Sequence, residues 1–436
     1  MESTNPAESR GLSLPSRILI GLVTGAILGL ALNVWVPEGP GQDRVIWWAD
    51  NVAKPAGDIF LRMLFMVVVP LVFSSLVLGV AGLGSMNNLG RLGGRTLMWF
   101  VGTTAFAATI GLTLVNVMAP GEGLSAEVRE QVMTQFAGDA QTRLDQAAAG
   151  TGFSIHTFVN IIPRNIFASA SNERETLGVI FFALIVGIAI TRIPSDRDRV
   201  FLDLLETIYE ICAKILGFAM WLAPVGVFGL VFAVTAKLGI DVMRSLGAYV
   251  VTAVSGLLFY QFVVLPAFAY FLIGITPKKL FTGVRALMIT AFSTSSSNAT
   301  LPTTMKTAIE NFDVPKPIAG FVMPLGATMN MNGTALFEGV TVLFLAQVAG
   351  VELSLGSQVI VIMMAVLTAI GSAGVPGGSL PLLTIVLSQV GVPPEMIALV
   401  IGTDRIVDMT RTMPNVTSDL LCSAWVAKHE RRHATG

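Results

Sequence analysis

The sequence predicts an all-α integral membrane protein, and its composition and patterning support this fold class. Of its 436 residues, 53% are hydrophobic and only 13% are charged, whereas soluble proteins carry about 25% charged residues. Several runs without a charged side chain, such as 63–90 and 245–277, exceed the ~20 residues that cross a bilayer as a helix. The alternating ten-residue segments of outer-membrane barrels are absent from the sequence.

Eight full spans are predicted, with two apolar segments that a single helix does not explain. The segment 279–312 is interrupted by the serines 295–297, which leaves about a dozen residues on each side, too few to cross. The segment 353–390 is broken at 371–378, where four glycines and Pro376 disfavour a continuous helix. Each is predicted to be a re-entrant hairpin whose tip faces a protein-lined cavity, because unpaired backbone groups are not tolerated in lipid. The full spans are 16–37, 56–82, 91–118, 175–194, 202–235, 243–274, 316–347 and 394–427.

The distribution of charge orients the predicted spans. Clusters of Lys and Arg fall on alternate sides of successive spans, and such clusters favour the cytoplasmic side. The loop 119–152 has two basic and five acidic residues, which is typical of an outside loop. We therefore expect a multi-pass protein of the inner (plasma) membrane with both termini in the cytoplasm.

The last predicted span carries five polar side chains on one helical face. They are spaced 4, 3, 4 and 4 residues apart. Charges in a spanning helix are costly and usually face a cavity or pathway. Internal salt bridges between helices are the alternative, but an arginine with a carboxylate on either side favours a site for a zwitterion and a further anion. The five residues are Asp404, Asp408, Arg411, Asn415 and Asp419.

Three other features suggest binding chemistry. The residues "NMNG" at 330–333 predict an unwound turn whose carbonyl oxygens suit Na⁺, or else a glycine kink packed against a neighbour. The serine tip at 295–297 offers amide N–H groups and hydroxyls to a carboxylate, or is a small-residue helix contact. Glu338 is the only acid in the apolar part of its helix, either as a protonated functional carboxyl or as an end residue that snorkels.

The two hairpins, each followed by a helix with polar residues in its middle, enter from opposite faces. This inverted repeat is typical of secondary transporters. The chain resembles the glutamate transporter family, the dicarboxylate/amino acid:cation symporters, over nearly its whole length. The motifs that carry the resemblance are "SSSNATLP" at 295–302, "NMNGTAL" at 330–336, "AGVPGG" at 373–378 and "DMTRTMPNVTSD" at 408–419.

The resemblance implies a homotrimer in which each protomer divides into a scaffold and a mobile transport domain that moves like an elevator. Residues 1–90 would hold scaffold helices 1 and 2, and 91–118 helix 3 of the transport domain. Residues 119–242 would hold the outside loop and scaffold helices 4 and 5, and 243–436 the rest of the transport domain with the cytoplasmic tail.

The resemblance also implies a substrate site for an acidic amino acid. The Ser296 amide and Asn415 would hold the α-carboxylate. Asp408, Thr412 and two carbonyls would hold the ammonium group, while Arg411 and Thr334 would hold the side-chain carboxylate. The implied substrate residues are Thr294, Ser295, Ser296, Ser297, Thr334, Val375, Gly377, Asp408, Arg411, Thr412 and Asn415.

Three Na⁺ positions and a proton position follow from the same resemblance. The first Na⁺ would use Asp419 and the carbonyls of Gly326, Asn330 and Asn415, and the second would use Thr328, Ala369, Ile370 and Ser372. The third would use Thr103, Thr104, Asn330 and Asn332. Glu338 aligns with the position that carries H⁺ in the eukaryotic members.

The chain departs from the family pattern at four positions. Family members carry an arginine at one of the positions where this chain has Thr294 and Met409, so that arginine is missing here. Asn332 replaces the aspartate of the usual "NMDG", and Ser379 replaces a glycine found in many members. Because a buried cation site without its carboxylate is weakened, we expect fewer Na⁺ per substrate than in relatives that keep the aspartate.

These features predict a symporter that takes up aspartate or glutamate with a Na⁺ gradient, with membrane lipid as its surroundings and no enzymatic activity or nucleic-acid partner. The alternatives are a proton-coupled acidic amino acid or C4-dicarboxylate transporter and an anion-conducting channel of the same fold. An intramembrane aspartyl protease built on Asp404 and Asp408 is disfavoured, because its carboxylates must face each other across a cleft, whereas these lie on one helix.

Overall fold

The structure is a computed structural model that describes residues 14–37, 39–84, 90–124, 130, 162–171, 176–193, 198–372 and 374–434. Helices dominate these residues, which contain no strand. In the first part of the chain the helices are α1 (Leu14–Trp35), α2 (Pro40–Trp48), the π-helix η1 (Ala49–Ala53), α3 (Lys54–Phe65), α4 (Val68–Gly84), α5 (Gly90–Met118), α9 (Ile166–Ser171) and α10 (Thr176–Ile190).

The second part begins with the longest helix, α11 (Asp198–Phe259), and ends with α20 (Asp404–Ala434). Between them are the π-helices η3 (Tyr260–Val264) and η4 (Ala269–Ile273), α12 (Leu265–Phe268), α13 (Pro277–Thr294), α14 (Ser297–Phe312), α15 (Lys316–Met329), α16 (Asn332–Ala349), α17 (Leu355–Gly371), α18 (Leu380–Gln389), the 3₁₀-helix η5 (Pro394–Met396) and α19 (Ile397–Val400).

Five helices of the described residues are long and apolar enough to cross a membrane: Ser16–Trp35, Pro40–Ala81, Leu92–Met118, Arg199–Ile273 and Lys316–Ala349. The fourth contains 75 residues and covers two predicted spans, separated by Gly239, whose φ of 66° and ψ of −152° interrupt the helical conformation. α20 is not among the five, because its first half carries the charged face that the sequence predicts.

Two predicted spans have different boundaries in the structure. The helix predicted at 56–82 begins at Pro40 in the structure, because proline occupies the first helical position of α2. The polar residues of α2 and η1 do not resemble a membrane span, so the sequence pattern did not indicate this extension. The span predicted at 394–427 is not one helix, since a turn at 401–403 separates α19 from α20. Asp404 therefore lies in the first turn of α20, where a carboxylate complements the helix dipole.

Both broken segments are pairs of contacting helices joined at a tip. In the first pair, α13 is followed by Ser295, which has a left-handed φ of 51°, and Ser296 caps α14 by accepting a hydrogen bond from the Ala299 amide (3.1 Å). At the other end of the pair, the Asn311 side chain donates to the Gly283 carbonyl (2.8 Å). α17 and α18 form the second pair, and the described residues of its tip are 372 and 374–379.

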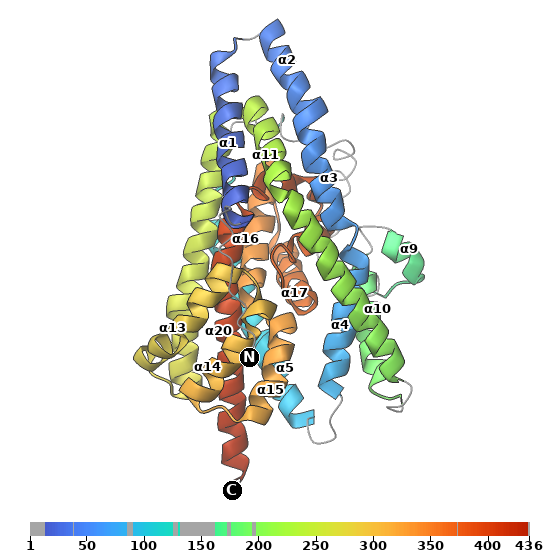
Figure 1. Cartoon of the computed structure of the whole chain (residues 1–436), viewed down its shortest axis with the longest axis vertical. Coiled ribbons are helices and arrows are strands. Elements are labelled where there is room, and N and C mark those ends of the chain that lie inside the picture. Colours follow the sequence, from blue (N-terminus) through green and yellow to red (C-terminus); the bar gives the residue numbers. More distant parts are fainter. Residues whose placement is uncertain are drawn as a thin grey trace, which may run out of the picture.

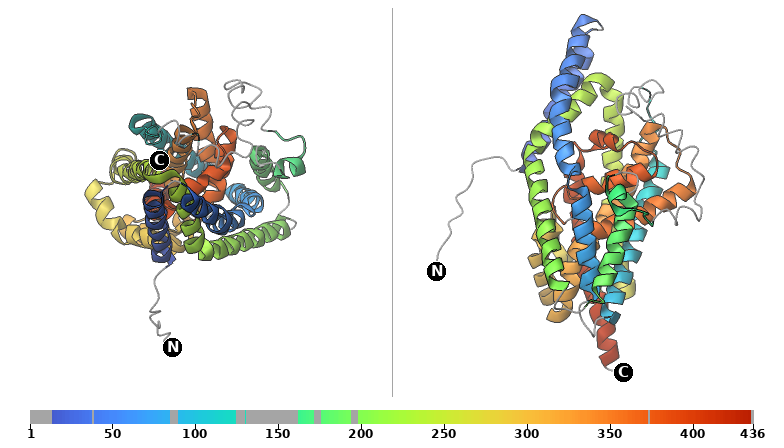
Figure 2. Two further views of the ribbon diagram at one scale, coloured as in Figure 1. Left: turned by 90° about the horizontal axis from the view of Figure 1, so that it is seen from above. Right: turned by 90° about the vertical axis from the view of Figure 1, so that its right-hand side faces the viewer.

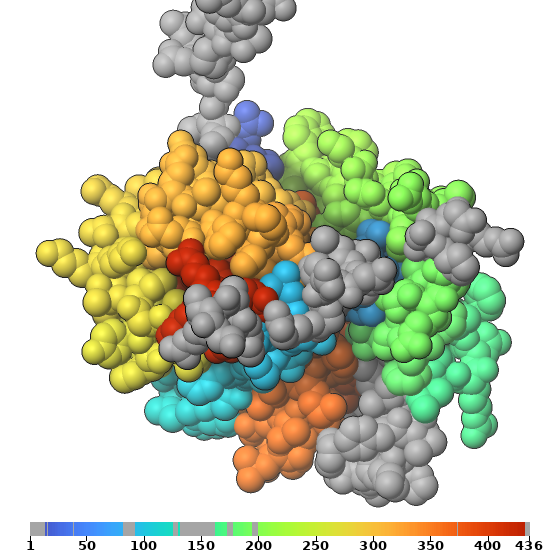
Figure 3. Space-filling view, turned by 90° about the horizontal axis from the view of Figure 1, so that it is seen from below, coloured from blue at the N-terminus to red at the C-terminus, as the bar shows by residue number. Residues whose placement is uncertain are grey.

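The two helix pairs surround α15, α16 and α20, and the remaining helices form an outer layer. α1 and α3 pack against α11, while α16 contacts α5, α11, α17 and α20 and is buried over nearly its whole length (Figure 1). The C-terminal end of α20 extends beyond its neighbours (Figure 2). Seen from below, this end lies among α5, α13, α14 and α15 (Figure 3). The five polar residues predicted on one face of α20 are all buried, so protein encloses this face.

Candidate functional site

The tips of the two helix pairs meet at the centre of the protein. The Ser296 hydroxyl donates a hydrogen bond to the Gly374 carbonyl (2.5 Å), and the Asn298 amide donates to the same oxygen (3.0 Å). A side chain at Gly374 would lie 2.7 Å from both the Ala327 carbonyl and the Asn298 side chain. Glycine is therefore required for the tips to approach this closely.

A small polar cavity of about 10 Å³ lies beneath the joined tips, with room for roughly one water molecule. Eight of the eleven predicted substrate residues line it. The other three adjoin it, since Ser296 contacts Gly374, Gly377 contacts Asp408, and Thr294 accepts a hydrogen bond from the Ser296 amide. The lining consists of Ser295, Ser297, Met331, Thr334, Ser372, Gly374, Val375, Ser379, Asp408, Arg411, Thr412 and Asn415.

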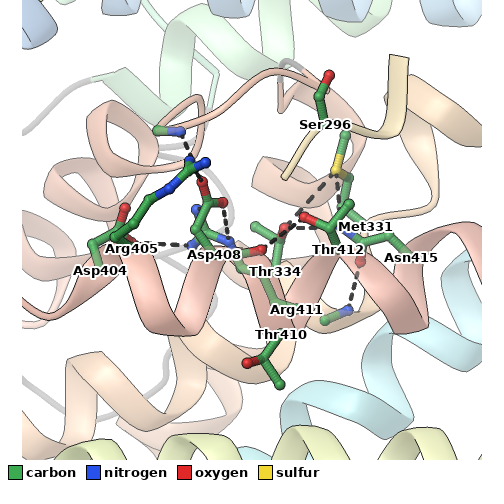
Figure 4. Close-up of polar contacts among 12 residues, drawn as sticks. Ser296, Met331, Thr334, Asp404, Arg405, Asp408, Thr410, Arg411, Thr412 and Asn415 are labelled. Carbon is green, nitrogen blue, oxygen red and sulfur yellow. Dashed lines mark hydrogen bonds and ion pairs between the residues drawn. The ribbon is translucent and has the colours of Figure 1, made fainter. Parts of the chain in front are cut away.

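An arginine and an aspartate of α20 form the strongest contact in this cavity (Figure 4). The Nε and Nη2 atoms of Arg411 donate to Oδ1 of Asp408 at 3.0 and 2.7 Å, and Nη1 lies 3.6 Å from Oδ1 of Asp404. The guanidinium also lies 4.4 Å from the ring centroid of Phe337, within range of a cation–π interaction. These ion pairs join residues of one helix, unlike the interhelical salt bridges considered as an alternative.

A second arginine, which was not among the residues predicted for the site, reaches the same aspartate. Nη1 of Arg405 lies 3.6 Å from Oδ2 of Asp408, and the Arg405 side chain is only 8% exposed. Its Nε atom has no hydrogen-bond partner. The two positions where family members carry an arginine hold Thr294 and Met409, but Arg405 supplies another cation beside the site. The available signal was the spacing of three residues between Arg405 and Asp408, which places the two on one helical face.

The predicted unwound turn between α15 and α16 is confirmed. Asn330 (φ −117°, ψ 65°) and Met331 (φ −97°, ψ 62°) leave the helical conformation, and α16 begins at Asn332. The freed Gly333 amide donates to Oδ1 of Asn415 (2.7 Å), and the Asn415 amide group lies 3.4 Å from the Thr334 hydroxyl. The turn thus links α16 to the polar face of α20.

A buried carboxylate at this turn has the chemistry of a cation site. Asp419 is 2% exposed, and its Oδ1 accepts a hydrogen bond from the Asn330 side chain (2.8 Å). A side chain at Gly326 would collide with Oδ1, so the backbone of α15 lies directly against the carboxylate. Within the described part of the chain, no Lys or Arg side chain forms a salt bridge with Asp419. Oxygen ligands around an uncompensated charge fit Na⁺.

The residues predicted for the second ion position would offer mainly backbone carbonyl oxygens, and most of them lie at the end of α17. Ala369 and Ile370 lie in its last turn and Ser372 follows it, while Thr328 lies in α15, which contacts α17. Ser75 of α4 donates to the neighbouring Gly371 carbonyl (2.8 Å). The structure therefore brings these residues to adjoining elements.

The residues predicted for the third ion position form a neutral hydrogen-bond network around Asn332. Oδ1 of Asn332 accepts from the Thr104 hydroxyl (2.7 Å), with the Thr103 hydroxyl at 3.4 Å. Its Nδ2 atom donates to Ser418 (2.7 Å) and to Tyr260 (3.2 Å). Every polar atom of this fully buried amide is satisfied by protein, so its oxygen is already engaged by hydroxyl donors.

Glu338 is fully buried in the middle of the bundle, so the interpretation as a snorkelling end residue is wrong. Its Oε2 lies 2.6 Å from the Thr368 hydroxyl, while Oε1 has no hydrogen-bond partner. The same hydroxyl lies 2.8 Å from the Met364 carbonyl. The Thr368 hydroxyl donates to Oε2 of Glu338 and has only one hydrogen for these two oxygens, so a proton on the Glu338 carboxyl would relieve their competition.

Comparisons with known proteins agree with this geometry. The model of the sodium:dicarboxylate symporter family matches residues 14–429. The chain is 33% identical to the proton/sodium-glutamate symport protein of Geobacillus stearothermophilus, over 97% of this chain and 96% of that protein. It is 31% identical to excitatory amino acid transporter 3 of Mus musculus (95% and 86%) and 29% identical to the C4-dicarboxylate transport protein of Bacillus subtilis (96% and 94%). The chain therefore belongs to the sodium:dicarboxylate symporter family.

Proposed function

We propose that this protein is a secondary active symporter that takes up acidic amino acids, aspartate or glutamate, with a Na⁺ gradient. The observation that carries the proposal is the buried contact between Arg411 and Asp408 at the meeting point of the two tips. An acidic amino acid offers one cationic and two anionic groups, and this contact holds a partner for each charge type. Relatives with glutamate in their names support the substrate class.

Substrate entry requires the contact to open. Arg411 turns from Asp408 to the side-chain carboxylate, which its planar guanidinium matches bidentately. The substrate ammonium then takes the released Oδ1 of Asp408. The α-carboxylate lies between the Ser296 amide and Asn415. The ammonium and the side-chain carboxylate thus take the places of Arg411 and Asp408 in their pair, so neither protein charge is left buried alone, while the α-carboxylate is held by neutral N–H donors.

The amino group is the basis for preferring amino acids over C4-dicarboxylates. Once Arg411 has turned away, a substrate without an ammonium leaves Oδ1 of Asp408 without its partner, which is costly in a buried site. The C4-dicarboxylate relative makes succinate the relevant competitor. We expect aspartate to compete for uptake more strongly than succinate, and equal competition would contradict the assignment of Asp408.

The buried charges favour two coupling Na⁺ ions. Of the described residues, the buried charged side chains are Glu338, Asp404, Arg405, Asp408, Arg411 and Asp419. With Glu338 protonated, three carboxylates and two guanidinium groups leave one negative charge. An acidic amino acid adds a second, and two Na⁺ neutralise the site. A third Na⁺ at the Asn332 network would leave a net buried charge, which is unfavourable. Glu338 supplies a position for proton movement beside Na⁺.

The motion and assembly that we propose are those of an elevator in a homotrimer. The group that begins with the second part of α11, runs through α20 and includes α5 would move against α1–α4, α10 and the first part of α11. Exposed apolar side chains of this outer layer, such as Trp48, Phe218 and Trp221, fit lipid or partner subunits. Chemical cross-linking of the purified protein tests the trimer. Labelling of cysteines introduced at the two tips, with and without substrate, tests the motion, because their accessibility should change when substrate binds.

Uptake of labelled aspartate by the purified protein in proteoliposomes tests the function. Na⁺ and H⁺ gradients are imposed separately, with a protein-free vesicle control. We expect saturable accumulation driven by inward Na⁺. Accumulation driven by H⁺ alone would favour the proton-coupled alternative. Uptake that is indifferent to Na⁺ would refute sodium coupling, and flux that neither saturates nor accumulates substrate would indicate a channel.

A further inference from the structure

The two oxygens of the Asp408 carboxylate have different partners. Oδ1 accepts both hydrogen bonds from Arg411. Oδ2 faces Nη1 of Arg405 at 3.6 Å and accepts from the Gly377 amide of the second tip at 3.3 Å. When Arg411 turns to a substrate, Oδ1 becomes available to an ammonium, whereas the contacts of Oδ2 are not needed by the substrate. Arg405 is therefore placed to remain beside Asp408 throughout binding.

We propose that Arg405 is a specificity-determining residue. Its positive charge, beside Oδ2 of Asp408, offsets the charge of that carboxylate and so allows the site to accept a dicarboxylate that has no ammonium group. The inference rests on the function proposed above. The effect of Arg405 depends on the substrate, because the same positive charge changes the affinity for an acidic amino acid and for succinate by different amounts.

For an acidic amino acid, the effect of Arg405 nearly cancels. The ammonium group binds on Asp408 and is repelled by Arg405 at short range, while the two carboxylates are attracted from farther away. For succinate, only the attraction remains, and Asp408 keeps a cationic neighbour after Arg411 has left it. At an effective dielectric constant of about 20, a unit charge about 10 Å away changes affinity roughly tenfold for each carboxylate.

Removal of the charge should therefore change the selectivity more than the affinity for aspartate. In Arg405→Gln we expect the ratio of the succinate inhibition constant to the aspartate KM to rise by about two orders of magnitude, while the aspartate KM changes less than about fivefold. Arg405→Lys keeps the charge and should restore a ratio within about fivefold of wild type. Arg244→Gln removes an exposed arginine that lies 3.6 Å from Asp241, and serves as the matched control.

The experiment measures uptake of labelled aspartate in proteoliposomes, with unlabelled succinate as competitor, for these four proteins. Elution of each variant as a single species in size-exclusion chromatography checks its fold. Equal losses for aspartate and succinate in Arg405→Gln, or a ratio that Arg405→Lys does not restore, would overturn the inference. So would succinate that fails to inhibit the wild type. A wild-type protein that takes up no aspartate would refute the proposed function instead.

Discussion

The substitution Asn332→Asp tests the explanation for ion coupling directly. The asparagine is fully buried, and its side chain contacts Thr104 (2.7 Å), Ser418 (2.7 Å) and Tyr260 (3.2 Å). All three partners are hydroxyls, which rotate and donate as readily as they accept. An aspartate of the same shape is therefore accommodated by reorienting hydroxyl hydrogens, and no new cavity or clash arises.

The added charge changes the electrostatic energy of a bound cation more than the altered hydrogen bonds change the energy of the site. A full negative charge 4 Å from a cation contributes about 4 kcal/mol at an effective dielectric constant of 20. That corresponds to about a thousandfold in the affinity of a Na⁺ held at the Asn332 network. The desolvation cost of the new carboxylate reduces this gain by several kcal/mol unless a cation accompanies it. The variant should consequently bind Na⁺ at this position or lose stability in its absence.

The assay is the reversal potential of aspartate flux in proteoliposomes, which gives the number of Na⁺ moved per substrate. We expect this number to increase by one in Asn332→Asp, with thermal stability that depends more strongly on Na⁺ than in the wild type. Asn116→Asp is the matched control, because Asn116 contacts Gln358 (2.8 Å) outside the site. A stable variant that moves the same number of Na⁺ as the wild type would refute the reasoning.

Three further predictions concern single side chains of the site. Arg411→Ala should abolish aspartate and glutamate uptake, with small neutral amino acids as the remaining substrates to test, and undiminished acidic uptake would contradict its role. Ser379→Gly removes a buried hydroxyl that has no hydrogen-bond partner in the protein. It should weaken aspartate binding by roughly tenfold, which corresponds to one hydrogen bond to a charged group. Unchanged competition by aspartate and glutamate would show that Ser379 does not contact the substrate. Glu338→Gln mimics the protonated carboxyl, so Na⁺-driven uptake should persist while stimulation by an inward H⁺ gradient disappears, and stimulation that survives would exclude Glu338 as the proton carrier.

The breaks in the helices were predictable from sequence because local chemistry decides them. Three consecutive serines supply a left-handed residue and a helix cap within two positions, and "NMNG" combines weak helix formers. The boundary of α20 was not predictable in the same way. The apolar run from 394 onward favours a continuous span, and the close packing of the turn residue Gly402 against Val231 and Leu22 is a tertiary contact that the local sequence does not contain.

The ion pairs of the site depend on information that a sequence pattern does not contain. Spacing places Asp404, Arg405, Asp408 and Arg411 near one another on α20, yet it does not say which oxygen each guanidinium approaches. That choice is fixed by the second tip, whose Gly377 amide holds Oδ2 of Asp408 and leaves Oδ1 to Arg411. The consequence for specificity follows from this division, because a cation on the oxygen that the substrate takes would block the ammonium, whereas a cation on the other oxygen permits a substrate with or without one.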